Sequence, residues 1–276
     1  MTTFIFLHGS FHAGWNWHKV LPLLASAGHK GLAPDLPGHG RDRTPPHKVT
    51  LKSSTDAVLA IIDALPKDEE IVLVAHSRNG IVISEAAEAR PHRLKGLVYL
   101  AAYLVPSGRS MMDYAIEDPT SLVVQNVQSS TPPQTIRRLV TIFKSPFARA
   151  LGRALLPSSQ QIHRLKRSAY KPALYHDCPD EIVELANTLL ESEPNWPGFE
   201  PLSLTANGFG SVPKTYIECL EDRAVTLPLQ RRMYQETPCD KVFSLASSHS
   251  PFFSQPEKLV EALIESLKVF APTPSA

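Results

Sequence analysis

The sequence predicts an α/β protein in which a mostly parallel, doubly wound sheet carries a helical cap insertion. Three observations lead to this fold class. Short apolar segments bounded by turn residues alternate with segments of helical periodicity, and such alternation implies parallel βαβ units. Several of the short segments are apolar at nearly every position, as in strands that are covered on both faces. The alternation stops within residues 107–211.

Strands and helices follow one another along the rest of the chain. The predicted strands are residues 3–7, 30–33, 71–75, 96–101, 214–219 and 241–245. The predicted helices are residues 15–28, 51–65, 79–89, 227–236 and 255–270. In the last helix the apolar residues that recur at helical spacing are Leu259, Leu263, Ile264, Leu267 and Phe270. This order fits one sheet with helices on both faces.

Residues 107–211 show no strand pattern. They are rich in helix-forming residues, basic in the middle (IRRLVTIFK and RLKRSAYK) and punctuated by prolines. We therefore predict a core of residues 1–106 and 212–276, with residues 107–211 inserted between two of its strands as a helical cap, or lid. The alternative is a solvated helical appendage that takes no part in binding.

Composition and charge exclude several classes of protein. The chain has 276 residues, 43% of them apolar, and a formal net charge of +1. No basic run marks a nucleic-acid partner, and no apolar run reaches the ~20 residues of a membrane helix. The histidines form no H-E-x-x-H pair, so no metal or cofactor is expected. The three cysteines lack C-x-x-C spacing, and no signal peptide is apparent, so we predict a cytoplasmic protein.

The stretch VLVAHSRNG places one serine, Ser77, between a predicted strand and a predicted helix. A serine at such a junction can simply cap the helix. The pattern small-x-Ser-x-small is also typical of a nucleophile on a strained turn, because its neighbours must be small for strand and helix to pass closely. Ala75 fits this pattern, whereas Asn79 stands where a second glycine is usual.

Two further chemical groups follow predicted strands. The strand KTYIEC leads into Glu221 and Asp222, and the strand KVFSL is followed by a loop that contains His249. Carboxyl ends of parallel strands meet at the edge of the sheet where open α/β folds place their sites. The chain order of serine, acid and histidine matches one known arrangement of a catalytic triad. Glu221 competes with Asp222 for the role of the acid.

These motifs resemble the α/β-hydrolase superfamily. Within it, the chain is similar to the plant methyl-ester esterase and hydroxynitrile lyase group and to bacterial carboxylesterases, including pyrethroid-hydrolysing esterases. The similar segments cover nearly the whole chain: HGSFHAGWNWHKVLPLLASAGHKGLAPDLPGHG, the serine turn, LVYLAAYLVPSG, ALYHDCPDEIVELANTLLESEP, and IECLED with SSHSPFFSQPEKL. The resemblance implies a parallel-sheet core with a helical cap between two strands.

The resemblance also implies roles for individual residues. The nucleophile would be Ser77, the acid Asp222 and the base His249. The oxyanion-hole donors would be the backbone N–H groups of Ser10 and Arg78. His12 matches a histidine at the pocket entrance, and Phe11 and Tyr103 are further candidates for the substrate pocket.

The function expected from this resemblance is a cofactor-free serine carboxylic-ester hydrolase acting on a small-molecule ester. Hydroxynitrile lyases of the group carry a lysine after the catalytic histidine, where this chain has Ser250. Ser77 argues against epoxide hydrolases and haloalkane dehalogenases, which use a carboxylate there. A hydroxynitrile lyase, a cofactor-free dioxygenase and a non-catalytic small-molecule receptor on the same fold stay open as alternatives, and so does a homodimer.

Large apolar and aromatic side chains in the insertion suggest the kind of ester. They are Met111, Met112, Tyr114, Leu122, Val123, Phe143, Phe147, Tyr170, Tyr175, Trp196 and Phe199. About half are expected to form the core of the cap itself, and the rest to line an apolar pocket. We therefore expect a preference for hydrophobic, uncharged esters, bulky aromatic or pyrethroid-like esters among them.

Overall fold

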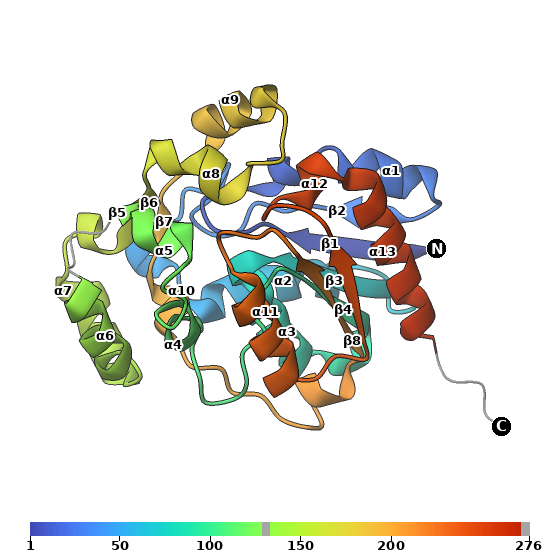
Figure 1. Cartoon of the computed structure of the whole chain (residues 1–276). Coiled ribbons are helices and arrows are strands. Elements are labelled where there is room, and N and C mark those ends of the chain that lie inside the picture. The colour runs from blue at the N-terminus through green and yellow to red at the C-terminus, as the bar shows by residue number, and fades with distance from the viewer. Residues whose placement is uncertain (129–132, 272–276) are drawn as a thin grey trace.

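The computed structural model describes residues 1–128 and 133–271. Its centre is a six-stranded sheet in the order β2-β1-β3-β4-β8-β9, in which all neighbours pair in parallel (Figure 1). The strands are β1 (Thr2–Leu7), β2 (Lys30–Leu32), β3 (Glu70–His76), β4 (Leu94–Leu100), β8 (Lys214–Cys219) and β9 (Lys241–Leu245). Every predicted strand is present, with each boundary within two residues of its predicted position.

Both faces of this sheet are covered. In β1, Phe4 and Phe6 pack on one face while Ile5 and Leu7 pack on the other, as the alternation of side chains along a strand requires. Helices α1 (Val20–Ser26) and α13 (Pro256–Val269) share the first core. Helices α2 (Leu51–Ala64), α3 (Gly80–Ala89) and α11 (Leu227–Glu236) share the second. The predicted doubly wound α/β fold is therefore confirmed.

The first helix is shorter than the predicted residues 15–28. The chain forms a 3₁₀ turn, η1 (Gly14–Trp17), before α1 begins at Val20. Pro22 explains this break, because a proline within a longer helix would clash with the carbonyl of His18 and leave it without a donor. In the first turn of α1 the missing N–H costs nothing, since that position has no helical partner.

Between β4 and β8 the chain forms mostly short helices. They are α4 (Met111–Ala115), α5 (Leu122–Asn126), α6 (Pro133–Ile142), α7 (Pro146–Leu155), α8 (Tyr170–Leu174), α9 (Asp180–Leu189) and α10 (Trp196–Phe199). The prediction that this stretch has no strand is wrong. Strands β5 (Val127–Gln128), β6 (Ile162–Leu165) and β7 (Glu193–Pro194) pair in the order β5-β6-β7, antiparallel throughout. Strands of two to four residues are too short to show alternation in a sequence.

In Figure 1 this inserted segment, green to yellow, lies to the left of and above the sheet, and β1 points toward it. Because the six strands are parallel, their carboxyl ends face the same side as that of β1. The loops that leave these ends include a short helix, α12 (Pro251–Ser254). Among the described residues, no helix has the length and apolar character to span a membrane. The division into a core and a cap at residues 107 and 211 stays a prediction.

Candidate active site

Ser77 lies on the turn that joins β3 to α3. Ser77, Arg78 and Asn79 form a single buried 3₁₀ turn, η3. The backbone of Ser77 has φ 55°, a left-handed conformation that costs energy for any residue but glycine. Its carbonyl accepts a hydrogen bond of 2.9 Å from the N–H of Tyr103. Ser77 does not cap α3, since the N-cap position of that helix is Asn79.

The position that must be small lies just after this turn, at Gly80, the first residue of α3. A Cβ on Gly80 would lie 2.4 Å from the carbonyl oxygen of Tyr103. Asn79, which departs from the expected pattern, has room for its side chain, and its Nδ2 donates to the carbonyl of His8 at 2.5 Å. The asparagine thus ties the serine turn to the end of β1.

The loop after β1 lies directly against the serine turn. A Cβ on Gly9 would lie 2.5 Å from Nδ1 of His76 and 3.0 Å from Cβ of Ser77. The next residue, Ser10, is half-buried. Phe11 has φ 67°, and its N–H donates to Oε2 of Glu193 at 2.7 Å. Because the Phe11 N–H is occupied, the N–H of Ser10 is the better candidate for an oxyanion donor in this loop.

Asp222 and His249 meet at the same edge of the sheet, in the loops that follow β8 and β9. Nδ1 of His249 lies 2.6 Å from Oδ2 of Asp222, and both residues are buried. The N–H groups of Ala224 and Val225 donate to Oδ1 of Asp222 at 2.7 and 3.0 Å, and Nε2 of Gln230 donates to Oδ2 at 3.2 Å. These bonds fix the carboxylate in one orientation toward the imidazole.

The competing acid, Glu221, does not share this environment. Its side chain is exposed, whereas that of Asp222 is buried against His249. The backbone of Glu221 pairs with the loop before His249, through a bond of 3.0 Å from its N–H to the carbonyl of Ser247. The geometry therefore favours Asp222 over Glu221 as the partner of the histidine.

Other histidines around the site are neutral hydrogen-bonding groups. Burial lowers the pKa of His76 well below its usual value, and Nε2 of this ring lies 2.8 Å from the carbonyl of His249. Burial lowers the pKa of His12 to about 3. Nδ1 of His12 faces the carbonyl of Ser10 at 2.7 Å, and Nε2 faces the hydroxyl of Tyr175 at 2.5 Å. These contacts hold the loops that carry the site.

A cavity of about 980 Å³ opens onto Ser77 and His249. The other sequence-predicted residues that line it are Ser10, Phe11, His12, Arg78 and Tyr103. Asp222 does not line it, but is bonded to His249, which does. The structure thus brings all eight predicted residues to one place, at the carboxyl ends of β1, β3, β4 and β8 and in the loop after β9.

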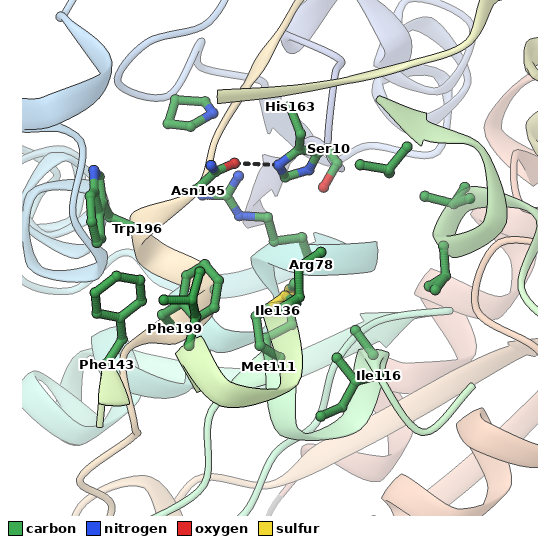
Figure 2. A pocket seen from close by; sticks show the side chains of 18 of the residues that line it. Ser10, Arg78, Met111, Ile116, Ile136, Phe143, His163, Asn195, Trp196 and Phe199 are labelled. Carbon is green, nitrogen blue, oxygen red and sulfur yellow. Dashed lines mark hydrogen bonds between the residues drawn. The ribbon is translucent and has the colours of Figure 1, made fainter. Parts of the chain in front are cut away.

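The inserted segment supplies most of the apolar wall of this cavity (Figure 2). Of the eleven large side chains singled out in the sequence, those that line it are Met111, Met112, Val123, Phe143, Trp196 and Phe199. The other five do not: Tyr114 and Tyr175 are fully buried, Leu122 and Tyr170 are half-buried, and Phe147 is 78% exposed. The expectation that about half would face a pocket fits this division.

Sequence reasoning missed two sets of residues in this wall. Aliphatic side chains of α6 and α7 also line the cavity, among them Ile136, Leu151 and Leu155. The spacing of Leu151 and Leu155, one helical turn apart, could have indicated a common face. The second set is polar: Nδ1 of His163 lies 2.5 Å from Oδ1 of Asn195, as Figure 2 shows.

The residue after Ser77 carries a buried charge. Arg78 is 4% exposed and Glu193 is 1% exposed, and Nη1 of the arginine forms an ion pair with Oε1 of the glutamate. Burial lowers the pKa of Arg78 to about 9. The side chain is still protonated at neutral pH, and the adjacent carboxylate favours the charged form. The sequence patterns assigned Arg78 a role only through its backbone and did not point to Glu193.

Side chains that could bind a metal do not gather in the part of the chain that the structure describes. Residues 1–128 and 133–271 contain no group of three or more histidine, cysteine, aspartate or glutamate side chains suited to a metal ion. Cys178, Cys219 and Cys239 are free thiols. At the cavity the structure brings together a serine, a histidine and, bonded to the histidine, a carboxylate.

Comparisons with known proteins agree with the observed fold. The profile of the family described as "Alpha/beta hydrolase family" matches residues 4–262. "Putative methylesterase 11, chloroplastic" of Arabidopsis thaliana is 30% identical over 269 residues, which are 96% of this chain and 64% of that protein. The chain thus spans slightly less than two thirds of that relative's length.

Two other relatives are similar over nearly their full lengths. Salicylic acid-binding protein 2 of Nicotiana tabacum is 30% identical over 268 residues, 95% of each chain. The crystal structure of a pyrethroid hydrolase from Sphingobium faniae JZ-2 is similar with a TM-score of 0.75 and 25% identity, over 97% of each chain.

Proposed function

The chain belongs to the α/β hydrolase family, and from this premise we propose that it is a serine carboxylic-ester hydrolase acting on hydrophobic, uncharged esters. One observation carries the proposal: the bond of 2.6 Å between His249 and Asp222, beside a large apolar cavity that Ser77 and His249 both line. The names of the relatives, a methylesterase and a pyrethroid hydrolase, support ester hydrolysis.

The proposed reaction passes through an acyl-enzyme intermediate. Because Nδ1 of His249 is bonded to Asp222, Nε2 is left to take the proton of Ser77 as its Oγ attacks the ester carbonyl. The protonated imidazole then gives that proton to the leaving alcohol. Water, activated by the same histidine, attacks the acyl-enzyme and releases the acid. No cofactor takes part in these steps.

Stabilisation of the oxyanion is assigned to two backbone N–H groups. They are those of Ser10, in the loop after β1, and of Arg78, which follows Ser77 in the serine turn. Gly9 allows the loop and the turn to approach closely, which supports a shared site for the carbonyl oxygen. Such preorganised donors act at the place where negative charge develops in the transition state.

The preference for uncharged esters follows from the wall of the cavity. Most of its apolar side chains come from α4, α5, α6, α7 and α10 of the inserted segment, which in this proposal acts as a cap. Among the described residues, two arginines line the cavity: Arg78, whose charge is balanced by Glu193, and Arg137, which is exposed to solvent. An anionic ester would therefore lose its hydration in exchange for few polar partners.

The chain-length dependence of ester hydrolysis tests this substrate preference. Each methylene buried in the cavity contributes ~0.8 kcal/mol, or about fourfold in kcat/KM. We expect kcat/KM for p-nitrophenyl esters to rise from acetate to hexanoate and to flatten in the double variant Leu151→Ala/Leu155→Ala. Phe147→Ala is the matched control, because Phe147 lies on the same helix and does not line the cavity. A wild-type profile that falls steadily with chain length would contradict the proposal.

Cleavage of cyanohydrins is expected to be absent. The related lyases carry a cation after the catalytic histidine to hold the departing cyanide, and this chain has Ser250, which is fully buried. We expect cleavage of mandelonitrile, followed as the release of benzaldehyde, to stay at the rate without enzyme. Cleavage at a rate comparable with ester hydrolysis would favour the lyase alternative.

A further inference from the structure

One carboxylate of the inserted segment contacts both segments that carry the proposed oxyanion donors, the loop after β1 and the serine turn. Glu193 lies on β7, and Oε2 of its side chain accepts the N–H of Phe11 at 2.7 Å. The N–H of Glu191 in turn donates to the carbonyl of Phe11 at 2.9 Å. Both backbone polar groups of Phe11 are therefore bound to the inserted segment, and this fixes the loop that presents the N–H of Ser10.

The other carboxylate oxygen of Glu193 binds a residue of the serine turn. Oε1 forms the buried ion pair with the guanidinium of Arg78, the residue whose N–H is the second proposed donor. Figure 2 shows the Arg78 side chain reaching away from the serine turn toward Asn195 and His163. His39 closes the arrangement, with Nε2 3.2 Å from Oε2 of Glu193. One side chain thus connects the loop after β1 with the turn after β3.

We propose that Glu193 is a positioning residue for the oxyanion site, which sets the spacing between the N–H groups of Ser10 and Arg78. This inference rests on the proposed esterase function. Since Glu193 belongs to the inserted segment, the oxyanion site reaches its active geometry only when β7 is docked on the loop after β1. The inserted segment then contributes to the chemical step as well as to the substrate pocket.

Two features favour this role over a purely structural one. The side chains of Arg78 and Glu193 are 5% and 1% exposed, so both charges lose their hydration. Apolar side chains of similar volume often stabilise a fold at least as well as such a buried ion pair, so stability alone does not explain the pair. The strained φ of 67° at Phe11 also needs surroundings that hold it, and strain of this kind gathers at functional sites. Glu193 meets the strained residue directly.

The test compares Glu193→Gln with Glu191→Gln. The control removes the same charge two residues away on the chain, where the carboxylate binds the N–H of Gly40 at 3.0 Å and Nη1 of Arg43 at 2.9 Å. Glu191 thus also ties the inserted segment to the core, but its side chain does not bind the loop of Ser10 or the serine turn. Ester turnover is measured per active site, with active sites titrated by a fluorophosphonate, so that loss of folded protein does not lower the value.

We expect Glu193→Gln to lower kcat by ~10²-fold, the scale of one lost oxyanion donor, with KM changed less than about threefold. Glu191→Gln should stay within about twofold of the wild type. A trifluoromethyl ketone, which adds to Ser77 as a tetrahedral oxyanion, should lose affinity for Glu193→Gln by the same factor as kcat falls. A purely structural role would lower the melting temperature and the titratable fraction, and would leave kcat per site unchanged.

The double variant Arg78→Met/Glu193→Met keeps the test decisive if the single variant does not fold. It replaces the buried pair by apolar side chains and removes the acceptor of the Phe11 N–H, so the same loss of kcat per site is expected. Turnover per site within twofold of the wild type in the folded variant would overturn the inference and leave the proposed function intact. A wild-type protein that neither hydrolyses esters nor reacts with the fluorophosphonate would overturn both.

Discussion

Replacing Ser77 by alanine is expected to lower kcat for ester hydrolysis by at least ~10³-fold while the protein folds normally. The substitution removes the Oγ atom that attacks the carbonyl, and residues that act together in catalysis lose most of their effect when any one is removed. The fold should tolerate the change, because Ser77 is bonded through its carbonyl to the N–H of Tyr103, and an alanine keeps that bond.

Steady-state hydrolysis of p-nitrophenyl butyrate and the thermal unfolding curve together check this expectation. The melting temperature serves as the control for folding, and the activity of the wild type measured in the same preparation sets the scale. If the Ser77→Ala variant kept near-full activity with an unchanged melting temperature, another residue would have to be the nucleophile.

The second large effect is expected at the acid. Asp222→Asn should lower kcat/KM by up to ~10⁴-fold, because an amide at this position favours the wrong tautomer of His249 and cannot stabilise its charged form. The N–H groups of Ala224 and Val225 can still donate to the amide oxygen of the asparagine at the place of Oδ1, so the side chain should keep its position. Its NH2 group cannot accept the bond that Nε2 of Gln230 donates to Oδ2 of the aspartate. Glu221→Gln is the matched control, an adjacent loss of the same charge on an exposed side chain, and should stay within a few-fold of the wild type.

Measured kcat/KM values for the two variants decide between the neighbouring carboxylates. A greater loss in Glu221→Gln than in Asp222→Asn would move the acid to Glu221, and the bond of 2.6 Å between Asp222 and His249 would then not be that of the reacting enzyme. Equal and small losses in both variants would argue against any acid partner for the histidine.

Much of the fold could be read from the sequence, because its signals are local. Strands such as β3 are buried on both faces, so they appear as uninterrupted apolar runs between turn residues. Once the strands are parallel, their carboxyl ends lie at one edge, and residues as far apart as Ser77, Asp222 and His249 can be placed together without knowledge of side-chain contacts. The unusual Asn79 was visible, but its bond to the carbonyl of His8 was not.

What the sequence did not reveal depends on how the inserted segment docks. The bond between Phe11 and Glu193 joins residues 182 positions apart, and no local pattern marks either of them as a partner. Strands β5, β6 and β7 were not predicted either. With two to four residues each, they are too short to show alternation along the chain. A buried arginine looks like a surface arginine in a sequence, since only the structure shows the carboxylate that balances it.

Covalent labelling by a fluorophosphonate tests the central claim most directly. The probe phosphonylates a serine that is activated by a neighbouring base, and digestion followed by mass spectrometry locates the modified peptide. We expect stoichiometric labelling of the wild-type protein on Ser77, together with complete loss of ester hydrolysis, and no labelling of Ser77→Ala. A protein that hydrolyses esters while Ser77 stays unlabelled, or that is labelled on another serine, would contradict the assignment of Ser77 as the nucleophile.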